Sequence, residues 1–189
     1  GPLLDPFCGS GTIPIEAALL ARRIPPGLAD AERAPRRYAF QDWPGHDARL
    51  LDEVVDHARE VVLVSGGAAI VGSDRDEGAI AAARSNAERA GVAGDLDLSV
   101  RALSRVEAPH GAGWLVTNPP WGLRVGESAH LRDLYAALGN LARASLPGWR
   151  LTLLSADEAL DAQVGVELEE RARTVSGGVP VRIVSGRVS

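Results

Sequence analysis

Short apolar runs alternate with helical stretches along most of this chain. We expect buried strands at residues 2–5, 68–73, 96–101, 114–117 and 150–155, and helices with an apolar face at residues 12–24, 47–64, 77–90 and 131–145. Strands that alternate with helices of this length are typical of a parallel sheet with helical crossovers. The pattern therefore predicts an α/β fold with a mostly parallel sheet.

Two segments depart from this alternation. Residues 25–46 are rich in Pro, Gly and Arg and are predicted to form a long excursion. After a short helix near residues 157–163, residues 167–176 and 179–188 flank Gly177-Gly178, a good turn signal for an antiparallel hairpin. We expect one domain over residues 1–189, with no internal repeat.

Composition excludes several classes of protein. The 189 residues are 46% hydrophobic and 24% charged, as in an ordinary globular domain. No apolar run has the length of a membrane span, and no cationic segment leads an apolar one. Cys8 is the single cysteine, which rules out an internal disulfide framework and a Cys-rich zinc module, and no metal site is expected. A reducing, cytoplasmic compartment is the expectation.

The most informative motif is a glycine loop between a strand and a helix, Asp5-Pro6-Phe7-Cys8-Gly9-Ser10-Gly11-Thr12. Its glycines allow a tight turn and the close approach of a ligand. A phosphate loop of nucleotide hydrolases needs a lysine, which the chain lacks, and Pro14 stands where a dinucleotide loop has its third glycine. Asp5 would repel a pyrophosphate but suits the ammonium of an amino-acid-like ligand. Alone, the motif also fits a plain strand-to-helix turn.

A second motif, Gly72-Ser73-Asp74, ends the second predicted strand. A carboxylate at this place after a glycine loop can accept hydrogen bonds from both hydroxyls of a ribose. Asp74 or Asp76 could instead cap the next helix, and both roles can hold with Asp74 on the ligand and Asp76 as the cap.

A third motif, Asn118-Pro119-Pro120-Trp121-Gly122, directly follows the fourth predicted strand. The two prolines hold the backbone extended and remove two hydrogen-bond donors. Asn118 adds a side-chain acceptor, and Trp121 offers a flat surface on which a base can stack. This combination indicates a site for an exocyclic amino group; the alternative is a rigid turn with a buried tryptophan.

Taken together, these motifs resemble a known family. The match is carried by residues 4–12, Ile15-Glu16-Ala17-Ala18, Pro26-Gly27-Leu28, Trp43 with His46-Asp47, residues 72–74, and residues 118–120 with Gly122. In this order, over essentially all 189 residues, they resemble the catalytic domain of the RNA N2-guanine methyltransferases. Longer members of that family carry an N-terminal THUMP RNA-binding domain.

The resemblance implies a Rossmann-like class I methyltransferase sheet, mostly parallel with an antiparallel C-terminal hairpin, and S-adenosyl-L-methionine as cofactor. It implies a cofactor site made of Asp5, Phe7, Gly9, Gly11, Thr12 and Asp74, in which Asp5 orients the methionine end and Asp74 holds the ribose. It implies a catalytic group made of Asn118, Pro119, Pro120 and Trp121. There Asn118 and the Pro119 carbonyl accept hydrogen bonds from the target amine, and Trp121 replaces the usual tyrosine.

The sequence departs from the family at two places. Members often have an acid after the third strand, near the adenine amino group, and Ala102 stands there; Ser104 or a backbone carbonyl is the candidate replacement. The chain also begins on the first motif, so we expect the RNA-binding domain and the element before the glycine loop to lie outside this sequence.

Other candidate residues are assigned less specific roles. Cys8 lies in the cofactor turn and is expected to be structural, and Asp47 is expected to cap a helix beside His46. The net charge of −5 argues against a uniformly basic surface but allows a local patch. The best candidates for an RNA-backbone patch are Arg22, Arg23, Arg33, Arg36 and Arg37. Arg124 is a candidate for a flanking phosphate.

The leading hypothesis is methyl transfer from S-adenosyl-L-methionine to the exocyclic N2 of a guanine in rRNA or tRNA, with catalysis mostly by positioning. Methylation of adenine N6 or of a protein glutamine is the alternative, because the Asn118 motif serves any planar amine or amide. The hypothesis from another class is a non-catalytic remnant that binds RNA or a partner.

Overall fold

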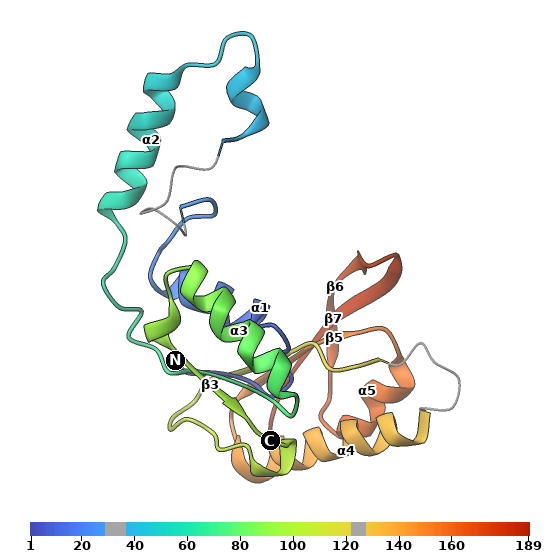
Figure 1. Ribbon diagram of the computed structural model, residues 1–189. Coiled ribbons are helices and arrows are strands. Elements are labelled where there is room, and N and C mark those ends of the chain that lie inside the picture. Colours follow the sequence, from blue (N-terminus) through green and yellow to red (C-terminus); the bar gives the residue numbers. More distant parts are fainter. Residues whose placement is uncertain (29–36, 122–127) are drawn as a thin grey trace.

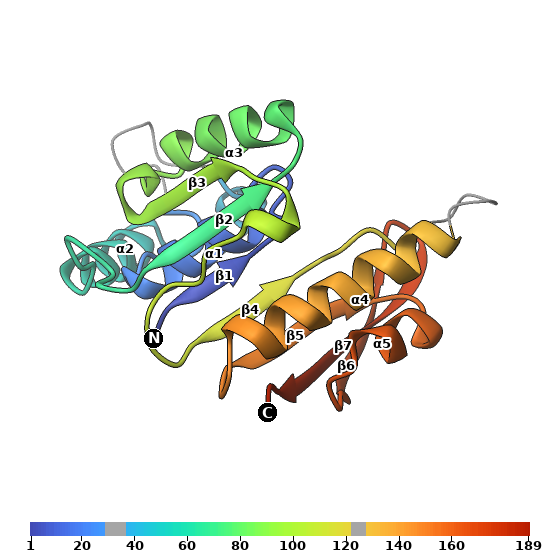
Figure 2. The same cartoon turned by 90° about the horizontal axis from the view of Figure 1, so that it is seen from below.

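The computed structural model describes residues 1–28, 37–121 and 128–189, and these parts form a seven-stranded sheet with helices on both faces (Figures 1 and 2). The strands are β1 (Leu3–Asp5), β2 (Ile70–Asp74), β3 (Leu96–Val100), β4 (Trp114–Thr117), β5 (Arg150–Ser155), β6 (Glu169–Ser176) and β7 (Val179–Arg187). The helices are α1 (Thr12–Ala21), α2 (Ala48–Glu60), α3 (Glu77–Arg89), α4 (Ser128–Ser145) and α5 (Glu158–Val164). Short 3-10 turns lie at η1 (Ala39–Asp42), η2 (Ala93–Asp95) and η3 (Leu103–Arg105).

The strand order is β3-β2-β1-β4-β5-β7-β6. β1 pairs in parallel with both β2 and β4, and β7 runs antiparallel between β5 and β6. The chain therefore adds β2 and β3 on one side of β1, and then crosses to the other side of β1, where it forms β4 and the remaining strands. The predicted mostly parallel sheet with an antiparallel C-terminal hairpin is confirmed.

Two apolar cores hold the layers together, one on each face of the sheet. On one face α4 and α5 cover Leu4, Leu115, Leu151 and Leu153. On the other face α1 and α3 cover β1 to β3, and Ile70 is among the buried residues. Each fully buried leucine contributes about 1.5–3 kcal/mol, so these cores fix the strands whose ends carry the motifs. Figure 2 shows α1 and α3 on one side of the sheet and α4 and α5 on the other.

Helix α1 ends at Ala21, three residues before the predicted end at Ile24. Arg23 takes a left-handed backbone conformation (φ 58°), and the Ile24 amide donates to the Leu19 carbonyl at 2.8 Å. This closure satisfies a terminal carbonyl, so the apolar Ile24 continues the hydrophobic pattern without continuing the helix.

Helix α2 stands away from the sheet (Figure 1). The periodicity predicts residues 47–64, but the helix spans Ala48–Glu60, with Asp47 as the predicted N-cap accepting from the Arg49 amide at 2.9 Å. It ends early because Leu63 pairs with Arg22, through Leu63 N to Arg22 O at 2.8 Å and Arg22 Nε to Leu63 O at 3.0 Å. None of its residues is buried, so the helical spacing predicted the helix but not its packing.

The remaining boundaries agree closely with the sequence. Asp76 caps α3 as predicted, accepting from the Ala79 amide at 2.7 Å. Gly177 and Gly178 turn the hairpin with φ of 56° and 83°, as a two-residue turn requires. Helix α4 begins at Ser128 rather than at the predicted Leu131, because its first turn is not apolar and carries no periodic signal. No helix in the described ranges is both long and apolar enough to cross a membrane.

Candidate active site

The carboxyl ends of β1 and β4 lie side by side at the point where the strand order reverses, which is where open α/β sheets bind ligands. Asp5 ends β1 and Thr117 ends β4, and the Thr117 hydroxyl donates to Asp5 Oδ1 at 2.5 Å. The Phe7 amide donates to the same oxygen at 3.1 Å. Asp5 and Thr117 are 112 residues apart in the sequence, and this bond joins the glycine loop to the Asn118 motif.

Asp5 is 1% exposed, and its burial raises the pKa of the carboxyl from 3.8 to about 7. The two hydrogen bonds from Thr117 and Phe7 oppose this rise, while the nearby Asp74 carboxylate adds to it. Among the described residues, none donates to Asp5 Oδ2. A buried carboxyl with one unused oxygen is suited to a cationic group such as an ammonium.

The glycine loop is tied to the end of β2. The Gly9 amide donates to Asp74 Oδ2 at 3.1 Å, and the Asp76 amide donates to Asp74 Oδ1 at 3.0 Å. Gly11 (φ 88°) lies so close to α3 that a Cβ there would meet the Ala83 Cβ at 3.0 Å. Asp76 is therefore the cap of α3 and Asp74 faces the loop, while a contact of Asp74 with a ligand stays a prediction.

These residues fit an adenosyl cofactor. A carboxylate has about four lone-pair sites, and Asp74 uses two of them, so two remain for the hydroxyls of a ribose. A Cβ at Gly9 (φ 52°) would meet no atom within 4 Å, so the backbone of the loop is open to close approach. Asp5 would supply the carboxylate for the amino-acid end.

Phe7 and Thr12 are also predicted to bind the cofactor. Phe7 is partly buried and packs against the core beneath α4, while Thr12 is exposed as the first residue of α1. Their contribution to cofactor binding stays a prediction.

The predicted catalytic residues follow β4 directly. Pro119 is buried, Asn118 and Pro120 are exposed, and Trp121 is partly buried. The Trp121 indole Nε1 donates to Asn118 Oδ1 at 2.7 Å. Nothing in the sequence marks this bond beyond the presence of a tryptophan, whose ring can donate. Gly122, the last residue of the motif, lies outside the described residues.

Ala102 stands where an acid is expected for the adenine amino group. It is exposed and follows β3, whose end is joined to β2 by the Arg101 amide donating to the Asp74 carbonyl at 2.8 Å. The Ala102 carbonyl accepts from the Arg105 amide at 2.8 Å, and Ser104 is exposed beside it. Position 102 is therefore close to the end of β2, where Asp74 lies, but its side chain offers no carboxylate.

Two of the three described arginines of the predicted patch already bind other groups, while the third, Arg23, is exposed. Arg22 binds the Leu63 and Gly91 carbonyls and pairs with Asp95 at 3.5 Å, so its role is to hold loops together. Arg37 pairs with Asp42. The other predicted contacts, Arg33, Arg36 and Arg124, lie outside the described residues.

Cys8 and the histidines carry no catalytic signal. Cys8 is buried, and burial raises the pKa of its thiol to about 12, so it stays protonated and inert. His46 lies edge-on to Phe40 with ring centroids 5.8 Å apart. Within the described ranges, no three His, Cys, Asp or Glu side chains gather closely enough to hold a metal ion.

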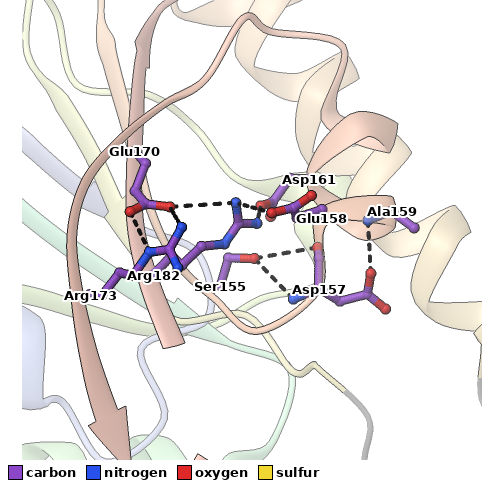
Figure 3. A network of polar contacts seen from close by, with 8 residues as sticks. All are labelled: Ser155, Asp157, Glu158, Ala159, Asp161, Glu170, Arg173 and Arg182. Carbon is purple, nitrogen blue, oxygen red and sulfur yellow. Dashed lines mark hydrogen bonds and ion pairs between the residues drawn. The ribbon is translucent and has the colours of Figure 1, made fainter. Parts of the chain in front are cut away.

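A charged network near the carboxyl end of β5 has no counterpart among the sequence motifs (Figure 3). Arg182 of β7 donates to Glu158 at 2.9 Å and to Asp161 at 2.7 Å, both on α5, and lies 3.9 Å from Glu170 of β6. Asp161 is 9% exposed, and its burial raises the pKa of that carboxyl. The network fastens α5 to the hairpin. Its members come from three elements, so no spacing in the sequence marks them.

The strand order, the glycine loop after β1 and the acid at the end of β2 together define the Rossmann-like fold of the class I methyltransferases, whose cofactor is S-adenosyl-L-methionine. The predicted class and cofactor are thus confirmed. Within this class the chain belongs to the RMKL-like methyltransferase domain family, whose sequence model matches residues 1–179.

Named relatives agree with this assignment. The chain is 36% identical over 180 residues to a ribosomal RNA large subunit methyltransferase K/L of Shewanella sp. (strain MR-4), covering 94% of this chain and 24% of that protein. It therefore spans about a quarter of the length of the curated relatives it matches.

Two solved structures are similar over nearly the whole chain. SMU.472, described as a methyltransferase in complex with SAH, superposes with a TM-score of 0.87 at 29% identity, covering 100% of this chain and 48% of the other. A protein from Listeria monocytogenes described as a predicted N6-adenine-specific DNA methylase gives a TM-score of 0.77 at 25% identity, covering 96% and 46%.

Proposed function

We propose that this chain transfers a methyl group from S-adenosyl-L-methionine to the exocyclic N2 amine of a guanine in rRNA or tRNA. The observation that carries the proposal is the 2.5 Å hydrogen bond between Thr117 and Asp5. It holds the residue before Asn118 against the carboxylate of the cofactor loop, so that an amine acceptor and a cofactor site share one edge of the sheet.

The cofactor side of this site comes from β1 and β2. Asp74 receives the ribose hydroxyls on its unused lone pairs, and Asp5 receives the ammonium of the methionine end on Oδ2. Gly9 leaves the backbone open to the ligand, and Gly11 allows the loop to pack closely against α3. When bound, the cofactor supplies an electrophilic methyl group on a sulfonium.

The amine side comes from the residues after β4. Asn118 Oδ1 and the Pro119 carbonyl accept the two hydrogens of the target amine and so orient the lone pair of its nitrogen. Pro119 is buried and has no N–H, so the backbone here is anchored and offers no competing donor. Trp121 provides the surface on which the base stacks. Catalysis is then by orientation, which can supply about 7–11 kcal/mol of the barrier.

RNA is the substrate class that the relatives favour, since those at 36% identity are named ribosomal RNA methyltransferases. We further propose that residues 1–189 form the catalytic domain and that RNA is recruited by a further domain, in the cytoplasm. In support, the chain has a net charge of −5 and spans 24% of the relatives' length. Two arginines of the predicted patch, Arg22 and Arg37, already hold other contacts.

The test is an assay with labelled S-adenosyl-L-methionine and unmodified rRNA or tRNA, followed by digestion to nucleosides. We expect N2-methylguanosine in the digest. N6-methyladenosine would instead support the alternative that the name of the Listeria protein suggests. Methylglutamine in a protein substrate would support the other alternative.

The Asn118→Ala variant then separates a catalytic site from a non-catalytic remnant. It removes the side-chain acceptor and should abolish methylation while leaving the binding of S-adenosylhomocysteine (SAH) intact. Asn140→Ala is the matched control, because Asn140 is an exposed asparagine on α4 whose side chain accepts a hydrogen bond from Arg143. Methylation unchanged in Asn118→Ala would refute the catalytic assignment.

A further inference from the structure

The side chain of Asn118 is held from one side by Trp121. The indole Nε1 lies 2.7 Å from Asn118 Oδ1. An indole N–H can only donate, so the atom that faces it must be the amide oxygen. Asn118 is exposed and makes no other side-chain hydrogen bond with a described residue.

Without such a partner, the amide of Asn118 would have two orientations. Its backbone is fixed on both sides, because Thr117 is bonded to Asp5 and Pro119 is buried. The amide plane can still turn by half a rotation, which exchanges the acceptor Oδ1 for the donor Nδ2. Only one of these orientations can receive an N–H from a substrate.

We propose that Trp121 is a positioning residue that selects the oxygen-out orientation of Asn118 and thereby restricts the site to nucleophiles that carry N–H donors. This inference rests on the proposed function. A carbonyl oxygen has two lone pairs, so the indole takes one and leaves the other for the target amine. The two donors bind the same oxygen together and do not compete.

The selection follows from the chemistry of the excluded orientation. If Nδ2 faced the substrate, it would bind a ring nitrogen or a carbonyl oxygen, and it would leave the indole N–H opposite another donor. That orientation loses the bond from Trp121 and is therefore unfavourable. The site therefore accepts an exocyclic amine and disfavours a bare ring nitrogen.

The kinetic test uses Trp121→Phe, which keeps an aromatic surface and removes the donor. We expect kcat for RNA methylation to fall about fivefold to tenfold, as the loss of one hydrogen bond allows. A rate that rises would overturn the proposal, because it would mean that the indole blocks the oxygen instead of orienting it.

The same Trp121→Phe change, made in the Asn118→Asp variant, shows whether Trp121 acts through the amide of Asn118. A carboxylate has two equivalent oxygens and needs no orientation, so Trp121→Phe should change kcat there by less than about twofold. An equal loss in both backgrounds would show that Trp121 acts only by stacking or packing, which overturns the proposal.

A spectroscopic measurement tests the bond without RNA or catalysis. The chain has four tryptophans, and the Trp121 indole resonance in a ¹⁵N–¹H spectrum is the one lost in Trp121→Phe. In Asn118→Ala that resonance should shift, and its hydrogen should exchange faster with water. Trp149, which donates to the Gly111 carbonyl at 2.6 Å, is the internal reference and should not change. An unchanged Trp121 resonance would refute the positioning role even if RNA methylation were confirmed.

Failure of the proposed function has a different signature. If the unmodified chain and its longer form make no N2-methylguanosine, the proposed reaction is wrong, whatever the Trp121 resonance shows.

Discussion

Gly9 and Asp74 lie 65 residues apart in the sequence, and the Gly9 amide donates to Asp74 Oδ2 at 3.1 Å. This bond orients the carboxylate from the loop side, while the Asp76 amide orients it from the helix side at 3.0 Å. The acid is thus set in place before a ligand arrives. Preorganisation of this kind lowers the cost of ordering a side chain on binding.

The first prediction concerns cofactor affinity. Asp74→Asn removes the charge that strengthens hydrogen bonds to ribose hydroxyls and places an amide donor against a backbone N–H. Hydrogen bonds to charged groups are worth about 1.5–3 kcal/mol, so SAH should bind roughly tenfold to hundredfold more weakly. Calorimetric titration of the chain with SAH measures this directly.

Asp76→Asn is the matched control for that prediction. Asparagine caps helices as well as aspartate, so α3 should keep its stability, and the backbone bond from residue 76 to Asp74 is unaffected. SAH affinity should therefore stay at the unmodified value. Equal losses in the two variants would show that the effect is structural and that Asp74 does not contact the cofactor.

Much of the fold follows from the sequence because each element carries its own local signal. Apolar runs alone predict the Trp114–Thr117 and Arg150–Ser155 strands at their observed bounds. Asp76 marks the start of α3, and Gly177-Gly178 marks the hairpin turn. The glycine loop, Asp74 and Asn118 are also recognisable, since glycines, a carboxylate and an Asn-Pro-Pro run directly after buried strands are chemically distinctive.

What the sequence did not reveal depends on contacts between distant segments. Helix α2 has a strong apolar face, yet its Leu50 and Val54 are each 58% exposed, and periodicity says nothing of what a face packs against. The bond from Trp121 to Asn118 depends on side-chain rotamers. Arg182 meets acids from α5 and β6, which a linear pattern does not bring together.

A second prediction concerns stability and pH. The pKa of Asp5 is 3.8 when exposed and about 7 in the fold, so between these values the folded chain holds a proton that the unfolded chain has lost. The free energy of unfolding should therefore fall as pH rises from about 4 to 7, by at most about 1.4 kcal/mol per unit from this group. Asp5→Asn mimics the protonated carboxyl and should flatten this slope in urea titrations. If Asp5→Asn is not more stable than the unmodified chain at pH 8, the buried carboxyl is not the cause.

A third prediction couples the same proton to ligand binding. An ammonium beside Asp5 favours the carboxylate, so binding of SAH below pH 7 should release a proton from Asp5. The Kd should rise by up to about tenfold for each pH unit below about 7. Calorimetry in two buffers of different ionisation enthalpy counts the proton. Asp5→Asn should bind more weakly without proton release from this site, whereas an equal release from that variant would exclude Asp5 as the source.

The last prediction concerns the hairpin that closes the sheet. Arg182→Met should leave the buried Asp161 without its 2.7 Å partner and remove the cation that lies among Glu158 and Glu170. The loss of a hydrogen bond to a charged group costs about 2 kcal/mol, which for a domain of this size lowers Tm by about 4–8 °C. Arg173→Met is the control, because Arg173 pairs with Glu170 on the exposed side of the same hairpin and should change Tm little. Thermal unfolding followed by circular dichroism compares the two, and equal shifts would mean that Asp161 does not depend on Arg182.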